Sequence, residues 1–216
     1  MAINDTFNIF QYLALGAAST VYLAIFSIIL SGIGGLCLAA LLLQKFRIPR
    51  YCALTYSFTI RGIPLLVLLV GFYYSFPYLG FDFPPRVAAV IVISAYFSAH
   101  MAEVFRAAIN AIPRGQWDAG RSVGMRNATL LRIIILPLAM RLVAAPFVNV
   151  SLSILKGTSL VVAIGVWELA SAGRELEQRT GAALEIYLAV AAMYFVLCFA
   201  LSLVSRRIEK AFQYVH

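Results

Sequence analysis

The chain has 216 residues, of which 62% are apolar and only 12% are charged, and its net charge is +8. Because soluble domains carry about a quarter charged residues, this composition excludes an ordinary soluble domain and favours a small bundle of membrane helices. Lys and Arg collect in the cytoplasmic loops of membrane proteins, so the positive charge predicts an orientation in the membrane, and no nucleic-acid partner is expected.

Stretches with few charged residues divide the chain into five predicted membrane spans. A helix that crosses the hydrocarbon needs about 20 mainly apolar residues, and the third and fourth spans reach that length only if they include Glu103 and Lys156. The predicted spans are 17–43, 53–76, 86–106, 139–163 and 184–206. They form a membrane domain over 16–208, after an N-terminal segment 1–15 and before a C-terminal tail 209–216. The first span lacks a basic leader and is too long for a cleaved signal peptide.

Basic residues are distributed unevenly between the predicted loops. With the N-terminus outside, the two inner loops and the tail hold most of the 17 basic residues, namely Lys45, Arg47, Arg50, Arg106, Arg114, Arg121, Arg126, Arg132, Arg141, Arg206, Arg207 and Lys210. The outer side holds mainly acids, from Asp5 and Asp82 to the four Glu residues between 168 and 185. The sequence therefore predicts a multi-pass protein with its N-terminus outside and its C-terminus in the cytoplasm.

The inner loop between Pro113 and Pro137 is the most informative segment of the chain. Prolines in such positions punctuate helices, and the run 116–123 predicts a short helix that stops at Gly124. One face of this helix would hold Trp117, Gly120 and Val123. A short helix of this kind either lies flat on the lipid surface or docks into a groove of a cytoplasmic protein, and its pattern leaves both alternatives open.

The same loop resembles the signature of the membrane subunits of bacterial ATP-binding-cassette importers. That signature is Glu-Ala-Ala, three residues, Gly, nine residues, Ile, one residue and Leu-Pro. This chain has Asp118-Ala119-Gly120, three residues, Gly124, nine residues, Ile134, one residue and Leu136-Pro137. Asp replaces Glu at 118, and Gly replaces Ala at 120, which should weaken the short helix by roughly 1 kcal/mol. The resemblance implies coupling to an ATPase through Gln116, Trp117, Asp118, Ala119, Gly120, Arg121, Gly124, Ile134, Leu136 and Pro137.

Three further stretches, 58–66, 102–106 and 156–161, resemble the polar amino acid permease branch of that family. The resemblance implies an all-α polytopic membrane protein of the bacterial inner membrane, with five transmembrane helices and a short cytoplasmic coupling helix, which is the type I importer fold. It also implies a set of partners: two ATP-binding ATPase subunits, a second permease subunit that is identical or homologous, a periplasmic amino-acid-binding protein, the lipid bilayer and an amino acid substrate.

Nucleotide chemistry is not expected in this chain, because its sequence has no G-x-x-x-x-G-K-[ST] phosphate loop. ATP and Mg are therefore expected to serve the partner ATPase, while this chain is expected to be no enzyme and to hold no cofactor. The three Cys residues have no CxxC spacing, so no metal site is indicated.

Polar residues inside the predicted spans are candidates for the substrate pathway, because a charge near the bilayer centre costs about 2.5–3.5 kcal/mol. The candidates are Arg61, Glu103, Arg106, Lys156, Thr158 and Ser159. Structural alternatives stay open for each of them. Arg61 could snorkel to the cytoplasmic surface beside a bend at Gly62 and Pro64. Glu103 and Arg106 could form an intrahelical ion pair, and Gly157 with Thr158 could serve close helix packing.

Two other polar features also have alternative interpretations. His100 lies alone in the third span, and a hydrogen bond to a neighbouring helix is the simpler interpretation. The outer loop from Glu168 to Glu185 is expected either to meet the binding protein or to form a plain solvated surface.

The predicted function is the membrane subunit of an ATP-driven, binding-protein-dependent importer that works by alternating access. Arg61 and Lys156, together with a faint resemblance of 177–194 to glutamate/aspartate permeases, favour an acidic amino acid among polar ones. The alternatives are a secondary transporter of small polar solutes, which would need inverted repeats and acids deep in the spans, and a membrane assembly protein without transport. A membrane enzyme would need clustered His or acidic groups, and the sequence shows no such cluster.

Overall fold

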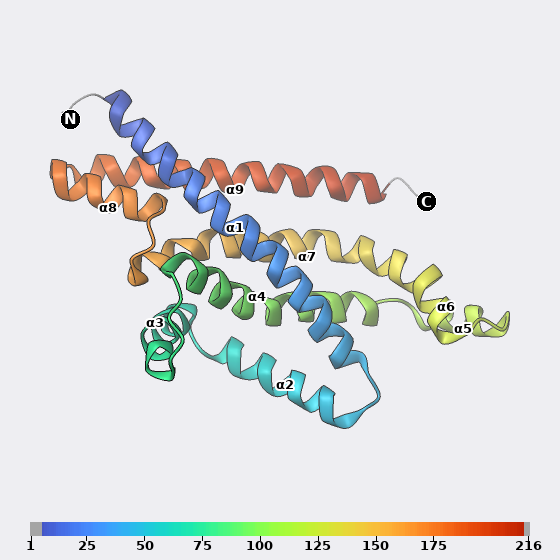
Figure 1. Cartoon of the computed structure of the whole chain (residues 1–216). Coiled ribbons are helices and arrows are strands. Elements are labelled where there is room, and N and C mark those ends of the chain that lie inside the picture. The colour runs from blue at the N-terminus through green and yellow to red at the C-terminus, as the bar shows by residue number, and fades with distance from the viewer. Residues whose placement is uncertain (1–5, 214–216) are drawn as a thin grey trace.

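The computed structural model describes residues 6–213, and every element in this range is helical (Figure 1). Residues 1–5 of the predicted N-terminal segment and 214–216 of the predicted tail lie outside the described residues, as do the side chains of Arg206 and Lys210. The helices are α1 (Thr6–Leu43), α2 (Arg47–Gly62), α3 (Leu65–Ser75), η1 (Phe76–Leu79), α4 (Pro85–Asn110), α5 (Arg114–Ser122), α6 (Asn127–Leu130), η2 (Leu131–Ile135), α7 (Leu136–Gly157), η3 (Thr158–Ile164), α8 (Leu169–Thr180) and α9 (Ala183–Gln213). The predicted all-α polytopic fold class is confirmed.

Four helical segments are long and apolar enough to cross a membrane, and a bent pair of helices makes a fifth candidate. The four are 8–43, 85–110, 127–164 and 183–204. The fifth is α2 with α3, which meet at an angle of 103° within the predicted span 53–76. Pro64 causes the break, because proline has no N–H to donate and forces the residue before it into an extended conformation. Ile63 accordingly has φ −104° and ψ 133°.

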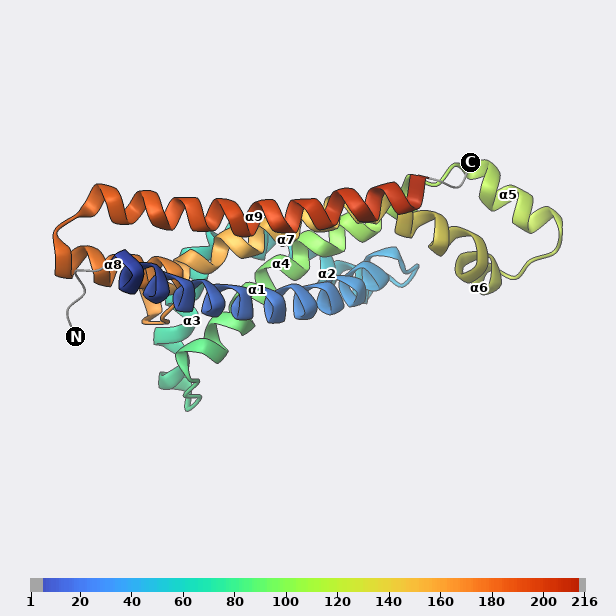
Figure 2. The same cartoon turned by 90° about the horizontal axis from the view of Figure 1, so that it is seen from above.

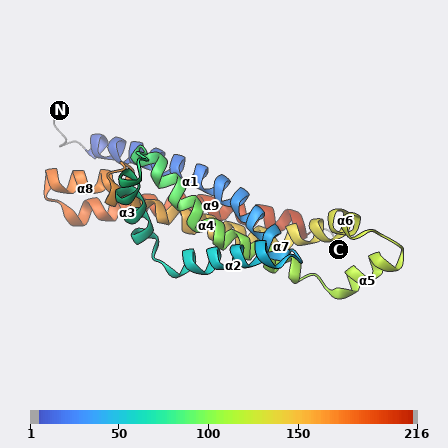
Figure 3. The same cartoon turned by 60° about the horizontal axis from the view of Figure 1, so that its bottom comes forward.

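The main hydrophobic core is built around α4, which packs along α1 and against α3 and α7 (Figure 3). Ile93 and Met101 of α4 are fully buried in it. α1 comes close enough that a Cβ on Gly34 would lie 3.0 Å from Cβ of Ser98. Glycine at this contact lets the two long helices approach closely, as small residues commonly do between membrane helices.

A second and smaller core, called the outer cluster below, lies at the other end of α1. It is formed by Leu13, Ala17, Leu169, Ala172, Leu176, Ile186 and Val190, which come from α1, α8 and α9. α8 lies inside the stretch that the sequence predicts as an outer loop, so the regular structure of this loop emerges only from the fold. Figure 2 shows α8 and the N-terminus at one end of the bundle, and α5 with α6 at the opposite end.

Candidate functional site

The short helix α5 lies at the end of the bundle (Figure 2). It contacts the rest of the chain through the face that holds Trp117 and Gly120. It is predicted at 116–123 and observed at Arg114–Ser122. Gly120 is its buried residue, and a Cβ there would collide with the side chain of Leu130, which is itself fully buried. An Ala at position 120 would therefore require the side chain of Leu130 to shift, which gives the departure from the signature a physical reason.

The other residues of α5 are largely in solvent. Asp118 and Arg121 form an ion pair of 3.7 Å with side chains that are 70% and 56% exposed. Trp117 is half-buried against the main core, whereas Val123, which the sequence places on the same face, is 77% exposed. The exposed and mostly polar face of α5 is free to contact another molecule; it holds Gln116, Asp118, Ala119 and Arg121.

The end of α5 is set by Gly124, which has the left-handed φ of 76° that glycine adopts most readily. The N–H of Met125 donates to the carbonyl of Gly120 at 3.1 Å and closes the turn. Farther along the signature, Ile134 is half-buried, and Leu136 and Pro137 are exposed. The segment before Pro137 is a π-helical turn, η2, because proline cannot donate the regular hydrogen bond to the residue four positions earlier.

A cavity of about 470 Å³ lies between α2, α4 and α7. Three polar residues line it, namely Arg61, His100 and Glu103, and its other walls are Val104, Ala107, Ala108, Ala111, Leu142, Pro146 and Val150. A mainly apolar wall with a few polar groups is typical of a small-molecule site. The structure therefore brings two of the predicted pathway residues together and adds His100 to them.

The polar groups of this cavity differ in how they are paired. Arg106 Nε donates to Glu103 Oε2 at 3.1 Å, and a second contact joins the same two side chains, so the predicted intrahelical ion pair is present. Among the described residues, Arg61 takes part in no ion pair. His100 Nε2 is buried and has no hydrogen-bond partner in the described part of the chain, so the simpler interpretation of this residue, a hydrogen bond to a neighbouring helix, is not supported at this atom.

The other three predicted pathway residues lie elsewhere. Lys156 is exposed near the end of α7, where the helix gives way to the 3₁₀-helix η3. Thr158 is fully buried, and its Oγ1 donates to the carbonyl of Leu155 at 2.7 Å. Ser159 Oγ donates to the carbonyl of Lys156 at 2.8 Å. None of the three is among the residues that line the cavity beside Arg61.

Glu168 lies in a different environment from the one that the sequence predicts. It is expected at an outer surface, yet it is fully buried at the N-terminus of α8. Its carboxylate accepts hydrogen bonds from Tyr194 Oη at 2.6 Å, Thr20 Oγ1 at 2.9 Å and the N–H of Ser171 at 3.0 Å. A contact with a binding protein is therefore wrong for this side chain, although the exposed residues of α8 remain available for it. The sequence contains no signal for this burial, because α8 is not predicted and two of the three donors come from distant parts of the chain.

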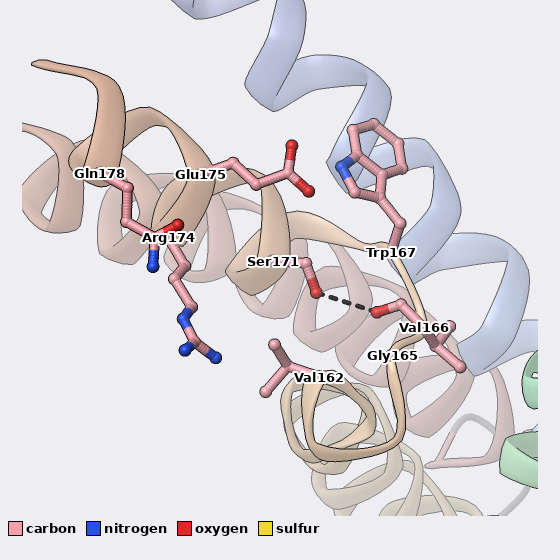
Figure 4. Close-up of a pocket in the computed structure, with 8 residues that line it drawn as sticks. All are labelled: Val162, Gly165, Val166, Trp167, Ser171, Arg174, Glu175 and Gln178. Carbon is pink, nitrogen blue, oxygen red and sulfur yellow. Dashed lines mark hydrogen bonds between the residues drawn. The ribbon is translucent and has the colours of Figure 1, made fainter.

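A smaller cavity of about 260 Å³ lies between η3 and α8 (Figure 4). Its lining includes Val162, Gly165, Arg174 and Gln178. Arg174 and Gln178 are exposed. Glu175 lines the same cavity, and it also accepts the hydrogen bond of the Tyr12 hydroxyl.

Comparison with known proteins identifies the family. A family model described as "Binding-protein-dependent transport system inner membrane component" matches residues 31–214. The chain is 38% identical over 196 residues to the L-cystine transport system permease protein TcyB of Bacillus subtilis, covering 90% of this chain and 84% of that protein. It is 36% identical over 165 residues to the glutamine transport system permease protein GlnP of Escherichia coli, covering 76% of this chain and 75% of the other.

Solved structures agree with these relatives. A chain in the crystal structure of an amino acid ABC transporter with histidines superposes with a TM-score of 0.91 at 27% identity, covering 98% of this chain and 99% of that one. A chain of the MetNI methionine ABC transporter superposes with a TM-score of 0.79 at 18% identity, which shows the shared fold. The protein therefore belongs to the binding-protein-dependent transport system inner membrane components, and it is a multi-pass permease of the polar amino acid ABC importers.

Proposed function

We propose that this permease forms, with a second identical or homologous permease subunit, the translocation pathway of an ATP-driven importer for a polar amino acid. Two ATPase subunits use ATP and Mg on the cytoplasmic side, and a periplasmic binding protein delivers the amino acid on the other. The N-terminus is periplasmic and the C-terminus cytoplasmic. Five spans make a small pathway on their own, and a two-fold or pseudo-two-fold pair completes it.

The observation that carries this proposal is α5. It is a nine-residue helix at the end of the bundle, with Gly120 packed against Leu130 and its polar face exposed. This arrangement suits a helix that fills a groove on another protein. Lying flat on lipid would require a wide apolar face, and the mostly charged and polar residues of α5 do not provide one.

Alternating access then follows from how α5 is attached. Closure of the ATPase subunits on ATP moves α5, and the motion reaches the bundle through α6 and η2, which connect α5 to α7. The π-helical turn of η2 is the segment of this connection that is expected to bend most easily. The two conformations must differ in their affinity for the nucleotide-bound ATPase, because only differential binding can shift the equilibrium between them.

The substrate pathway of this proposal passes through the cavity of Arg61, His100 and Glu103. Glu103 is neutralised by Arg106, so the cavity has an excess positive charge at Arg61. A guanidinium without an ion-pair partner suits the carboxylate of an amino acid, and an acidic side chain adds a second carboxylate. This favours glutamate or aspartate within the polar amino acids. Lys156, which is exposed where η3 begins, contributes at the other end of the pathway, whereas the hydroxyls of Thr158 and Ser159 donate to carbonyls of their own segment.

The experiment that tests the function is uptake into proteoliposomes. The permease is reconstituted with an ATPase subunit and a binding protein of the same importer, and uptake of radiolabelled glutamate and glutamine is measured with and without ATP. ATP-dependent uptake is expected. Uptake that persists without the ATPase would favour a secondary transporter, and an assembled complex with no uptake of any amino acid would favour an assembly role.

Coupling through α5 has a separate test. Cysteines at Trp117 and Asp118, in a chain whose native cysteines are replaced, should form crosslinks to the ATPase. A matched cysteine at Tyr78, an exposed aromatic residue of η1, should form none. Crosslinks that capture only lipid or the permease itself would contradict the coupling role.

A further inference from the structure

Glu168 is a buried carboxylate held by donors from three helices. Thr20 is on α1, Ser171 is on α8 and Tyr194 is on α9, and each gives one hydrogen bond. No ion pair joins Glu168 to a basic residue among the described side chains. A buried charge is costly unless its hydrogen bonds are made, so the three donors and the N-terminus of α8 together have to stabilise it. The same bonds tie the start of α8 to two other helices.

The surrounding hydrogen bonds strengthen this junction. The Thr20 hydroxyl also accepts the N–H of Leu169 at 3.2 Å, and Ser19 Oγ donates to the carbonyl of Trp167 at 2.8 Å. The first bond joins α1 to the first residue of α8, and the second joins α1 to the turn before it. Removing the Thr20 hydroxyl would take one partner from Glu168 and would leave the buried N–H of Leu169 without its acceptor, and an unsatisfied buried group costs more than the bond itself contributes.

Packing around the junction leaves no room for α8 to slide. A Cβ on Gly16 of α1 would lie 2.9 Å from Cβ of Ala172 and 3.0 Å from Cα of Leu169. A Cβ on Gly173 would lie 3.7 Å from Cβ of Val190 on α9. These contacts belong to the outer cluster, whose members on α8 are fully buried. Close-packed interiors have discrete arrangements and do not deform continuously.

The opposite side of α8 is different. It faces η3 across the cavity of about 260 Å³ (Figure 4). η3 is a 3₁₀-helix of seven residues. Such helices are usually shorter, because their hydrogen-bond geometry is poor. Gly157 precedes it and Gly165, with φ 76°, ends it. One buried hydrogen bond crosses this side, from Ser171 Oγ of α8 to the carbonyl of Val166 after η3, at 2.9 Å. The close-packed face of α8 is toward α1 and α9, and the face with the cavity is toward η3.

We propose that Glu168 is a positioning residue that keeps α8 fixed to α1 and α9 throughout the transport cycle, so that the outer side opens along the seam between α8 and η3. This inference rests on the proposed transport function. It assigns α8 to the static frame of the permease, and it assigns the moving part of the outer end to η3 with the outer end of α7.

A disulfide within the frame tests this directly. Gly173→Cys with Val190→Cys has the Cβ separation of 3.7 Å that a disulfide needs, in a chain whose Cys37, Cys52 and Cys198 are replaced by Ser or Ala. The oxidised complex is expected to transport at a rate within about twofold of the reduced complex, because a static frame needs no motion between α8 and α9. Oxidation that stops transport would overturn the proposal. If the reduced variant and its cysteine-free parent both lack ATP-driven uptake, the proposed function fails instead.

Substitution of the carboxylate supplies the second arm. Glu168→Gln is expected to keep its ATPase partner on purification but to lower amino acid transported per ATP hydrolysed by about tenfold, since a charge-assisted junction is lost. Forming the same engineered disulfide between α8 and α9 in the Glu168→Gln background is expected to restore that ratio. Glu177→Gln, a matched change at a half-buried position on the same helix, should leave the ratio unchanged. A Glu168→Gln variant that couples normally, or one that the disulfide fails to rescue, would refute the positioning role.

Discussion

Two short helices at opposite ends of this permease are built in opposite ways. α5 has nine residues, and Gly120 is its buried one; α8 has twelve, and Leu169, Ser171, Ala172, Gly173 and Leu176 are buried. α5 shows its polar groups to solvent, whereas α8 begins at a carboxylate that is buried among donors. A helix with so little packing on its own chain suits docking to another protein, and a helix with so much packing is part of the bundle. Length and position outside the spans therefore say little about which helix moves.

The largest effect is expected when Trp117, the half-buried aromatic residue of α5, is removed. Trp117→Ala is expected to lower ATP-driven uptake by about 30-fold. The half-buried ring packs α5 on the main core, and a Trp that also meets a partner at the edge of a docking helix typically contributes about 2 kcal/mol or more. Uptake and the amount of ATPase that co-purifies are the measurements. Tyr78→Ala, which removes an aromatic side chain that is 91% exposed, is the control. Unchanged uptake and ATPase retention in Trp117→Ala would mean that α5 does not dock through this residue.

The cavity between the two ends provides the next largest effect. Arg61→Gln is expected to raise the KM for an acidic amino acid by about tenfold with little change in kcat, since the variant loses a charge-assisted contact to a carboxylate. Initial rates of uptake at varied substrate concentration measure it. Arg86→Gln, at an exposed position at the start of α4, should behave like the native protein. If both substitutions raise the KM equally, Arg61 acts only through the net positive charge of the protein and not through a contact with the substrate.

A smaller effect, on thermal stability, is expected where α5 packs against Leu130. Gly120→Ala is expected to lower the thermal unfolding midpoint by a few degrees, because overpacking against Leu130 costs about 1–3 kcal/mol and exceeds the roughly 1 kcal/mol gained in helix propensity. Gly115→Ala has open space around its Cβ and should raise the midpoint slightly. Leu130→Val in the Gly120→Ala background is expected to recover part of the loss. If Gly120→Ala raises the unfolding midpoint as much as Gly115→Ala does, the close contact with Leu130 does not destabilise the variant.

The smallest effect is expected at the ion pair of Glu103 and Arg106. Both side chains are about two-fifths exposed, at 41% and 38%, so solvent weakens their attraction. Replacing both by Gln should change the free energy of unfolding by less than about 1 kcal/mol. Denaturation of the purified complex measures this change, and uptake is followed in parallel. A loss of uptake without a loss of stability would assign the pair to the pathway.

Features set by neighbouring residues could be predicted from the sequence. The ends of α5 follow from Pro113 and Gly124, and the break of the second span follows from Pro64. The size of that break could not be predicted, because α3 takes its direction from its packing on α4. The explanation of Gly120 also needed the structure, since Leu130 has to be seen against it.

Features set by distant residues could not be predicted. Glu168 has the local appearance of a solvated acid, and its donors Thr20 and Tyr194 lie 148 and 26 positions away in the chain. The pathway candidates show the same limit. Arg61 and Glu103 share a cavity although they are far apart in sequence, while Lys156 lies outside it. Polarity within a span marks a candidate, and only the packing of the helices decides which candidates meet.

The break between α2 and α3 also has a consequence for the lipid bilayer. The chain turns by 103° there, and the N–H groups of Val67 and Leu68 donate to the carbonyl of Pro64. The last carbonyls of α2 and the first two N–H groups of α3 have no such partner within their own helices. Hydrocarbon cannot satisfy such groups, which at membrane depth persist only where protein or water reaches them. Arg61 stands directly beside this turn and lines the adjoining cavity. Wherever this bend lies within the bilayer, its unpaired backbone groups require protein or water at their side, and the cavity beside Arg61 is the space in the fold that adjoins them.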